Sequence, residues 1–516
     1  MQGMRFCFWV GLTCLTHDAK LCCMGPAEVV LGECGRVQNG AKSPGQKAKA
    51  ANLSQPCGVL PVTFLAKMAA LFQLLLLLVP LITALPSSHT GKRDGPLPPG
   101  EDPFYTPPEG WESTAPGAIL RHRNPPFPVA AFGLADVNLD GSHQILYRTT
   151  DSFGDPIATV TTVLVPHNAD YTKVLSYQVA QDAADPNCSP SFAIQQFSDA
   201  GEALALIMPQ LEYVFMSSAL NKGFVVIVPD HLGPKSAFLA NTLSGQAVLD
   251  NVRAALASTD FTGISSDATV ALWGYSGGSL ASGFAAEIQP SYAPELEIAG
   301  AALGGTVPKI LPVINATNEG IFTGLIPAGI QGLANEYPDA QKLIRQGIRP
   351  DKWAEFNKTQ NLCLTGNIIE YLGQDVYSYT NDPNLFQSPL ADSLLQPNNM
   401  GRNTPQIPLL IYKAVNDEIS PIENTDELYE TYCSNGADVE YVRDFLSEHA
   451  VLTITGAPDA FMWLTDRLSG VAVESGCTRK TRLTGLLDPA ALGALGTDIV
   501  QLLLSFLSLP VGPVAR

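Results

Sequence analysis

Ser276 lies in the one Gly-x-Ser-x-Gly motif of this 516-residue chain, Gly274-Tyr275-Ser276-Gly277-Gly278. His449 is the only histidine downstream of that motif, and Asp417 lies between the two. A serine hydroxyl is too weak an acid to attack an ester unaided, so it needs a base within hydrogen-bond reach. We therefore predict nucleophilic catalysis in which Ser276 attacks, His449 takes its proton and Asp417 orients the imidazole.

The residues around Ser276 predict a turn between a strand and a helix. Residues 269–273 form an apolar run typical of a buried strand, and residues 279–288 read as a helix with small side chains along it. Such a turn holds the nucleophile at a strained backbone position, and the amide of Gly277 then points toward a developing oxyanion. Together with the order Ser, Asp, His, this indicates an α/β-hydrolase fold. The alternative interpretation is an ordinary Gly-Ser turn.

Strands and helices alternate along most of the chain, which predicts a mostly parallel sheet flanked by helices. Asp417 and His449 each follow a predicted strand, and the carboxyl ends of strands are where open α/β sheets place their sites. His231 also follows a strand, but it precedes Ser276 in the chain, and we interpret it as structural. The predicted strands are 143–149, 158–166, 173–179, 224–229, 269–273, 298–303, 407–412 and 439–445, and the predicted helices include 202–221, 242–257 and 279–288.

The alternation fails between residues 306 and 404, where apolar and small residues dominate. We predict that residues 306–404 form a mainly helical insertion between two parts of the hydrolase core, 94–305 and 405–477. Placed over the catalytic edge, the insertion would serve as a cap or lid. The alternative is additional helical packing that never moves. Residues 94–130 are rich in proline and glycine and are expected to wrap the surface as an irregular arm.

The N-terminal part of the chain indicates secretion. Residues 68–84 combine a methionine, an apolar run that is short for a membrane span, and small residues before Ala84, which predicts a signal peptide. Residues 1–67 hold six of the ten cysteines and show no sustained helical or strand periodicity of apolar residues, so we interpret them as a mis-assigned upstream segment. Residues 85–93 end in Lys92-Arg93 and would suit a pro-segment. The alternative is a signal anchor with a small cytoplasmic head.

The net charge of the chain limits the kinds of partner that it could bind. Residues 94–516 carry 21 Lys and Arg against 46 Asp and Glu, which argues against a nucleic-acid partner. The sequence has no His-Glu-x-x-His and no Cys-x-x-Cys motif, so we expect neither a metal nor another cofactor.

Cysteines and glycosylation motifs also fit an oxidising compartment. Four cysteines remain after residue 93, which predicts two disulfides with three pairings open: Cys188, Cys363, Cys433 and Cys477. Asn315 and Asn357 begin glycosylation motifs, and Asn187 matches as well but adjoins one of these cysteines.

Several motifs resemble the fungal secretory lipase family, over roughly residues 100–477. They occur in the same order as in that family: Ser176-Tyr177-Gln178-Val179, Asn187-Cys188-Ser189-Pro190-Ser191, Asp230-His231-Leu232-Gly233, Gly274-Tyr275-Ser276-Gly277-Gly278, Ser291-Tyr292-Ala293-Pro294-Glu295-Leu296 and Asp417-Glu418-Ile419. The resemblance implies the same triad, with Ser276 as nucleophile, and an insertion that controls access of acyl chains to it.

The resemblance also implies features that the residues alone do not give. Asp182 falls where the family supplies an oxyanion contact beside Gly277, and a carboxyl can stabilise an oxyanion only if it is protonated or acts through its backbone amide. This chain reads Ala180-Gln181-Asp182 where the family often has Tyr-Glu-Asp, so the surroundings of Asp182 differ from the family pattern. The implied disulfide pairs are Cys188 with Cys363 and Cys433 with Cys477.

The leading hypothesis is a secreted serine hydrolase that cleaves lipid esters, most of all triacylglycerols, at a lipid–water interface. A carboxylesterase or deacetylase acting on small esters or secondary metabolites would use the same triad. A third alternative is a catalytically inactive hydrolase fold used for binding, which the intact Ser276, Asp417 and His449 argue against. After Cys477 the resemblance fades, and residues 478–516 form an apolar tail that would either pack on the domain or meet a membrane surface.

Overall fold

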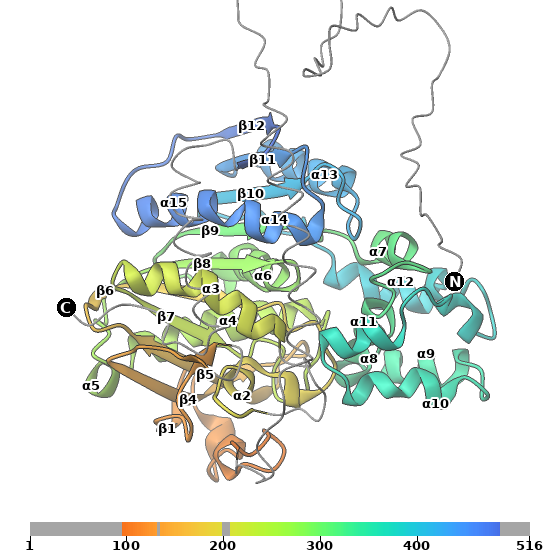
Figure 1. Ribbon diagram of the computed structural model, residues 1–516, viewed down its shortest axis with the longest axis horizontal. Helices are drawn as coiled ribbons and strands as arrows, with labels where there is room; N and C mark the ends of the chain where they lie inside the picture. The colour runs from red at the N-terminus through yellow and green to blue at the C-terminus, as the bar shows by residue number, and fades with distance from the viewer. Residues whose placement is uncertain (1–94, 132–134, 199–206, 486–516) are drawn as a thin grey trace, which may run out of the picture. The chain divides into compact units, whose positions relative to one another are not determined.

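A single large sheet organises the part of the chain that the computed structural model describes, residues 95–131, 135–198 and 207–485. These residues all belong to the compact unit Arg93–Arg516. The sheet has ten strands in the order β1-β4-β5-β7-β6-β8-β9-β10-β11-β12 (Figure 1). Their bounds are β1 Ile119–Arg123, β4 Gly141–Thr150, β5 Pro156–Val165, β6 Asp170–Gln178, β7 Phe224–Pro229, β8 Thr269–Tyr275, β9 Ile298–Gly304, β10 Leu409–Ala414, β11 Val439–Asp444 and β12 Cys477–Arg482.

The sheet is parallel from β7 through β12, and the strands before β7 in the order pair antiparallel. Parallel strands need crossover connections, and helices supply them on both faces. A short two-stranded sheet pairs β2 (Ala130–Ala131) with β3 (Ala135–Asp136). The prediction of a mostly parallel sheet flanked by helices is confirmed.

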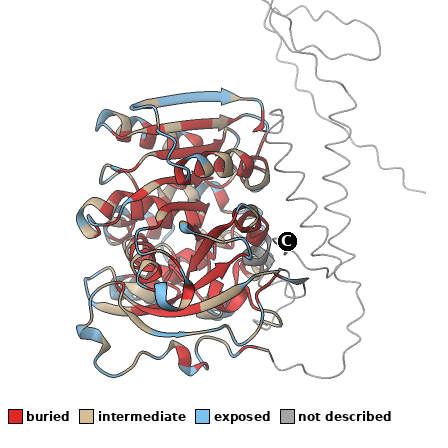
Figure 2. Ribbon diagram, turned by 90° about the vertical axis from the view of Figure 1, so that its left-hand side faces the viewer, coloured by how far each residue is buried: buried red, intermediate tan, exposed pale blue. Residues whose placement is uncertain are grey.

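Each central strand is buried on both faces because its alternate side chains enter two different apolar cores. In β8, Val270 and Leu272 face one core, and Ala271 and Trp273 face the other. Figure 2 shows these inner strands buried. The first core is covered by α4 (Asn241–Leu256), α6 (Gly277–Tyr292) and α13 (Ile422–Ser434), and the second by α3 (Ile207–Asn221), α14 (His449–Thr455) and α15 (Ala457–Leu468).

A group of short helices lies between β9 and β10 and has an apolar core of its own. Figure 1 shows this group to one side of the sheet. We call residues 310–398 the helical insertion. Its α-helices are α7 (Ile310–Thr317), α8 (Leu325–Glu336), α9 (Pro338–Gly347), α10 (Trp353–Phe356), α11 (Leu364–Glu370) and α12 (Pro389–Leu395).

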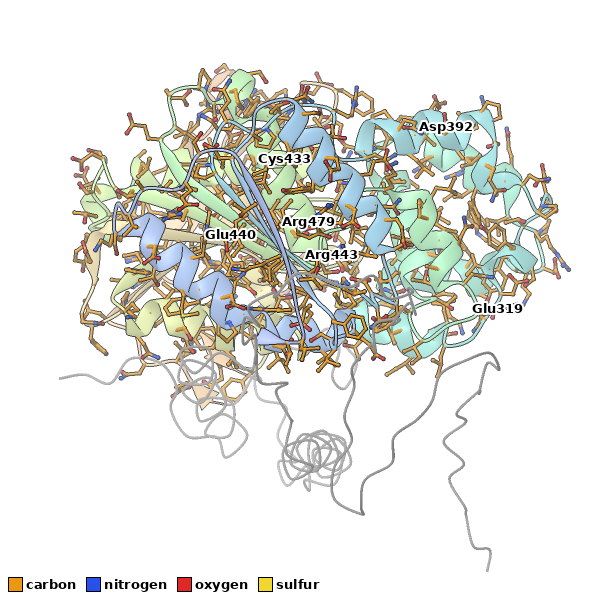
Figure 3. All side chains as sticks on the ribbon, turned by 90° about the horizontal axis from the view of Figure 1, so that it is seen from above. Glu319, Asp392, Cys433, Glu440, Arg443 and Arg479 are labelled. Carbon is orange, nitrogen blue, oxygen red and sulfur yellow. A yellow bond between two sulfur atoms is a disulfide. The ribbon has the colours of Figure 1, made fainter. Side chains whose placement is uncertain are left out.

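Two strands of the ten-stranded sheet were not predicted, and neither were the two-residue strands β2 and β3. The arm expected to be irregular contains β1, which pairs antiparallel with β4, so that interpretation was wrong for residues 119–123. At the other edge, β12 pairs with β11, and its sequence Cys-Thr-Arg-Lys-Thr-Arg lacks the apolar alternation that marks a strand. Its cations protect an exposed sheet edge from pairing with other chains. Figure 3 shows Arg479 of β12 and Glu440 of β11 at this edge of the sheet, away from Glu319 and Asp392 of the insertion.

Two disulfides are present, Cys188–Cys363 and Cys433–Cys477. These are the pairs that the resemblance implies. The first ties the segment after β6 to the start of α11 in the insertion, and the second ties α13 to β12. The proposed upstream segment, signal peptide and pro-segment lie outside the described residues, as does most of the apolar tail. Within the described part of the chain, no helix has the length and apolar character needed to cross a membrane.

Candidate active site

Ser276 sits at the sharp turn between β8 and α6, with a left-handed φ of 51° and a ψ of −119°. A non-glycine residue in this region is strained, and such strain persists only where the surroundings hold it. The backbone amide of Ser276 donates to the carbonyl of Gly304 in β9 at 2.9 Å. A Cβ at Gly274 would overlap the carbonyl of Gly278, and a Cβ at Gly278 would overlap the carbonyl of Gln178. Strand and helix therefore approach this closely only because both positions are glycine.

The three residues predicted to act together lie in one hydrogen-bonded chain. His449 Nε2 is 2.9 Å from Ser276 Oγ, and His449 Nδ1 is 2.7 Å from Asp417 Oδ2. Ser276 follows β8, Asp417 follows β10, and His449 follows β11 and is the first residue of α14. The parallel strands bring these three chain segments to the same edge of the sheet. Such an arrangement suits removal of the serine proton by a neutral imidazole.

The backbone of His449 is held at both of its polar groups. Its amide donates to Glu418 Oε2 at 2.6 Å, and its carbonyl accepts from the Tyr275 hydroxyl at 2.6 Å. Glu418 thus satisfies the free amides at the start of α14, where a carboxylate also suits the helix dipole. Sequence reasoning did not assign a role to Glu418, although it directly follows Asp417.

The Asp417 side chain is fully buried, and every side of its carboxylate is engaged. Lys413, also fully buried, lies 2.8 Å from Asp417 Oδ2, and Asp417 Oδ1 accepts from the amides of Ile419 and Ser420 at 3.0 and 2.7 Å. Burial alone would raise the pKa of Asp417, but His449 and Lys413 outweigh it and hold that pKa well below its usual value. The carboxylate therefore stays ionised. Sequence reasoning missed Lys413, although a lysine inside the apolar strand Leu-Leu-Ile-Tyr-Lys-Ala was a signal.

Asp182 lies against the amino-terminal end of α6. Its φ is 42°, its side chain is buried, and its Oδ1 occupies the space that a Cβ at Gly277 would need. The first amides of a helix have no intrahelical acceptor, so the amide of Gly277 is available to an oxyanion. Burial raises the pKa of Asp182 to about 7, against the lowering effects of His449 and of its own backbone amide. The protonated carboxyl, a hydrogen-bond donor, is thus accessible near neutral pH.

Ser276 opens into a cavity of about 590 Å³, part of which is open solvent. Its lining is apolar apart from Asp182, Ser276 and Gly277, and most of the apolar residues come from the helical insertion. Apolar lining with a few convergent polar groups is typical of a ligand site. The apolar residues are Phe238, Leu239, Leu280, Val307, Ile310, Val313, Ile314, Leu325, Ile326, Ile330, Leu333, Leu395 and Ile419.

The remaining predicted residues lie elsewhere. His231 is buried, burial lowers its pKa to about 4, and its Nε2 donates to the carbonyl of Val179 at 2.9 Å, which fits a structural role. Asn315 is exposed on α7, and its side-chain oxygen accepts from the Tyr377 hydroxyl at 2.6 Å. Asn357 is half-buried after α10. Among the described residues, no cluster of histidine, cysteine or carboxylate side chains has the arrangement of a metal site.

Comparison with known proteins supplies the family. The model of the family described as "Secretory lipase" matches residues 199–476. Lipase A of Arthroderma benhamiae is 48% identical over 427 residues, covering 82% of this chain and 91% of the relative. The chain belongs to the secretory lipase family. Lipase 4 of Candida albicans is 40% identical over 405 residues, covering 76% of this chain and 87% of that protein.

Solved structures agree with this assignment. The crystal structure of Candida antarctica lipase A in its closed state aligns with a TM-score of 0.72 at 28% identity, over 82% of this chain and all of that one. A putative hydrolase from Legionella pneumophila, at 15% identity and a TM-score of 0.55, shares the fold alone, over 69% of this chain and all of that one. The α/β-hydrolase fold and the resemblance to the secretory lipases are both confirmed. The protein is a carboxylic ester hydrolase.

Proposed function

We propose that this member of the secretory lipase family hydrolyses esters of long acyl chains, with triacylglycerols as the leading substrates. The observation that carries the proposal is the apolar cavity that opens at Ser276. A cavity lined almost wholly by Leu, Ile, Val and Phe favours a hydrocarbon chain, because burying each methylene contributes about 0.8 kcal/mol. The relatives described above are lipases, which supports the same substrate class.

The proposed reaction proceeds through an acyl-enzyme. Ser276 Oγ attacks the ester carbonyl carbon while His449 Nε2 takes the hydroxyl proton. The carbonyl oxygen becomes an oxyanion that accepts from the Gly277 amide and from the protonated carboxyl of Asp182. The tetrahedral intermediate then collapses, the ester C–O bond breaks, and the leaving alcohol takes the proton from His449.

Deacylation repeats these steps with water. Water attacks the acyl carbon while His449 removes a proton from that water. A second oxyanion forms and accepts hydrogen bonds from the same donors. Collapse releases the fatty acid and returns the proton to Ser276 Oγ. Asp417 holds the imidazole in the required tautomer and stabilises the imidazolium in both halves. Because Asp417 stays ionised next to Lys413, it supplies this charge without taking the proton.

The alternatives remain distinct proposals. A small-ester esterase or deacetylase would use the same three residues but would gain nothing from the apolar space beyond Ser276. A binding protein without activity is disfavoured by the hydrogen-bonded chain Ser276, His449 and Asp417. We also propose that the protein is secreted, after removal of residues 68–84, because two disulfides suit an oxidising compartment.

The test is hydrolysis of p-nitrophenyl acetate, butyrate, octanoate and palmitate, and of an emulsified triacylglycerol, by the protein and by Ser276→Ala. We expect kcat/KM to rise toward the long chains and to fall about 10⁴- to 10⁶-fold in the variant. Activity confined to acetate and butyrate would replace the lipase proposal with the small-ester alternative. Equal rates in the protein and the variant would refute serine catalysis.

A further inference from the structure

Asp182 lies in a short loop whose backbone is held by side chains from other parts of the chain. We call residues 180–184 the oxyanion loop. Its first amide, that of Ala180, donates to the buried carboxyl of Glu212 on α3 at 3.1 Å. Because Asp182 itself has a strained, positive φ, its position depends on contacts of this kind.

Ser236 bridges the residues on either side of Asp182. The side-chain amide of Gln181 donates to Ser236 Oγ at 2.7 Å, and Ser236 Oγ donates to the carbonyl of Ala183 at 2.8 Å. Ser236 is fully buried and also has a positive φ, 52°. Gln181 occupies one of the positions where this chain departs from the family pattern, so this bridge is a property of the chain's own residues.

The bridge is tied in turn to the helical insertion. Asn335, near the end of α8, directs its side-chain amide at three backbone carbonyls: Ala184 at 2.9 Å, Lys235 at 2.8 Å and Ser236 at 3.3 Å. One side chain of the insertion therefore satisfies carbonyls from both the oxyanion loop and the loop that contains Ser236. Carbonyls in such loops have no secondary-structure donor, so removing Asn335 leaves them to find other partners.

Helix α8 also packs directly on the backbone of the Ser236 loop. A Cβ at Gly332 would lie 2.5 Å from the carbonyl oxygen of Phe238 and 2.6 Å from its amide nitrogen. At Gly329 a Cβ would lie 2.5 Å from the side chain of Leu239. Two glycines on one face thus let the helix approach closely enough for Asn335 to reach the carbonyls. The same helix contributes Leu325, Ile326, Ile330 and Leu333 to the cavity wall.

We propose that Asn335 is a positioning residue for the reaction, because through Ser236 and Ala184 it fixes the oxyanion loop and so ties the placement of Asp182 to helix α8. This inference rests on the proposed function, in which Asp182 donates to the oxyanion. Asn335 does not touch the substrate; it acts through the loop. An error of about 1 Å in such a placement costs up to 10²-fold in rate.

The experiment compares Asn335→Ala with Asn381→Ala in the full-length protein. Asn381 is a matched control, because it also donates from the insertion to backbone carbonyls, those of Gln346 and Ile348, but away from the oxyanion loop. For Asn335→Ala we expect kcat to fall about 10- to 100-fold on both p-nitrophenyl acetate and octanoate, with KM nearly unchanged, because the oxyanion is the same for both esters. Asn381→Ala should leave kcat within about twofold.

A double-mutant cycle tests whether the effect of Asn335 passes through Asp182. In an Asp182→Gly background, where glycine accepts the positive φ and the carboxyl is gone, Asn335→Ala should lower kcat by less than about twofold. An undiminished effect in that background would overturn the proposal. A loss confined to octanoate, or a rise in KM alone, would also overturn it, because it would show that Asn335 shapes the cavity and does not place Asp182.

A readout without catalysis separates this inference from the proposed function. Hydrogen–deuterium exchange of the amides of residues 179–188 should become faster in Asn335→Ala and stay unchanged in Asn381→Ala. Unchanged exchange in Asn335→Ala would overturn the inference whatever the protein's activity. If exchange becomes faster but the protein shows no Ser276-dependent hydrolysis, the result would support the role of Asn335 in holding the oxyanion loop and would refute the proposed function.

Discussion

The protonation state of Asp182 gives the sharpest prediction. Burial raises the pKa of this carboxyl to about 7, so the donor form predominates below that pH and is lost above it. Two pH units above the pKa, about 1% of the carboxyl remains protonated. If the protonated form is the one that supports the oxyanion, kcat/KM should therefore fall about tenfold per pH unit above about 7, until the contribution of one oxyanion donor, about 10²- to 10³-fold, is lost.

Asp182→Asn isolates this effect, because an asparagine amide is a donor at every pH and asparagine tolerates a positive φ. The quantity to measure is the ratio of kcat/KM in Asp182→Asn to that in the unaltered protein, on p-nitrophenyl octanoate from pH 5 to pH 10. Titrations common to both proteins cancel in this ratio. We expect it to be flat below about pH 6 and to rise by about tenfold per unit above 7.

Asp230→Asn is the matched control for that experiment. Burial raises the pKa of Asp230 to about 7 as well, but its carboxylate binds the amide and hydroxyl of Ser191 and does not line the cavity. The ratio of kcat/KM in Asp230→Asn to that in the unaltered protein should be independent of pH. A flat ratio for Asp182→Asn would refute the protonated-donor reasoning, and a rise for both variants would show that loss of folded protein at high pH is being measured.

Three further predictions concern stability. Lys413→Met should lower the free energy of unfolding by about 3–5 kcal/mol, because it leaves the buried charge of Asp417 without its cation. The free energy of unfolding should fall as pH rises from about 4 to 8. Burial raises the pKa values of acids such as Glu212, whose pKa is about 8 in the folded protein, so unfolding releases protons in this range. Glu212→Gln should therefore flatten the slope of Tm against pH. Replacing Cys188 and Cys363 by alanine should cost about 4–5 kcal/mol, since the bond closes a loop with a sequence separation of 175.

Each of these has a control in the same chain. Lys352→Met removes a partly exposed ion pair with Glu355 and should cost less than about 1 kcal/mol; an equal loss for Lys413→Met would contradict the buried-pair argument. Asp392→Asn changes an exposed carboxyl and should leave the slope of Tm against pH as it is. Loss of Cys433–Cys477, with a separation of 44, should cost less than loss of Cys188–Cys363 by urea unfolding, and the reverse order would count against loop entropy.

Local sequence was enough to predict which three residues lie in the hydrogen-bonded chain, because each one is marked by its own strand. The run 269–273, the apolar strand before Asp417 and the strand before His449 are all legible from their residues, and chain order does the rest. The edge strand β12 was missed because its side chains are polar, and β1 because its half-exposed residues lie in a segment rich in proline and glycine.

The supporting residues could not be predicted for a different reason. Asn335 is 151 residues from Ala184, whose carbonyl accepts its hydrogen bond, and Glu212 is 32 residues from Ala180. Nothing in the residues around Asn335 distinguishes it from any polar residue near the end of a helix. Contacts of this kind depend on how the insertion packs against the loops at the sheet edge, which no local pattern encodes.

The surroundings of the two carboxyls at the candidate site shift their pKa values in opposite directions. Asp417 is paired with Lys413 and with His449. Its attraction to these two groups outweighs the cost of burying the charge, so it remains an anion. Asp182 is also buried, but it has no lysine or arginine partner among the described residues, so burial dominates and raises its pKa toward the neutral form. One carboxyl can then stabilise an imidazolium while the other donates to an oxyanion, as the proposed mechanism needs. Exchanging these environments should abolish both roles, because an ionised Asp182 would repel the oxyanion and a neutral Asp417 would no longer stabilise the imidazolium.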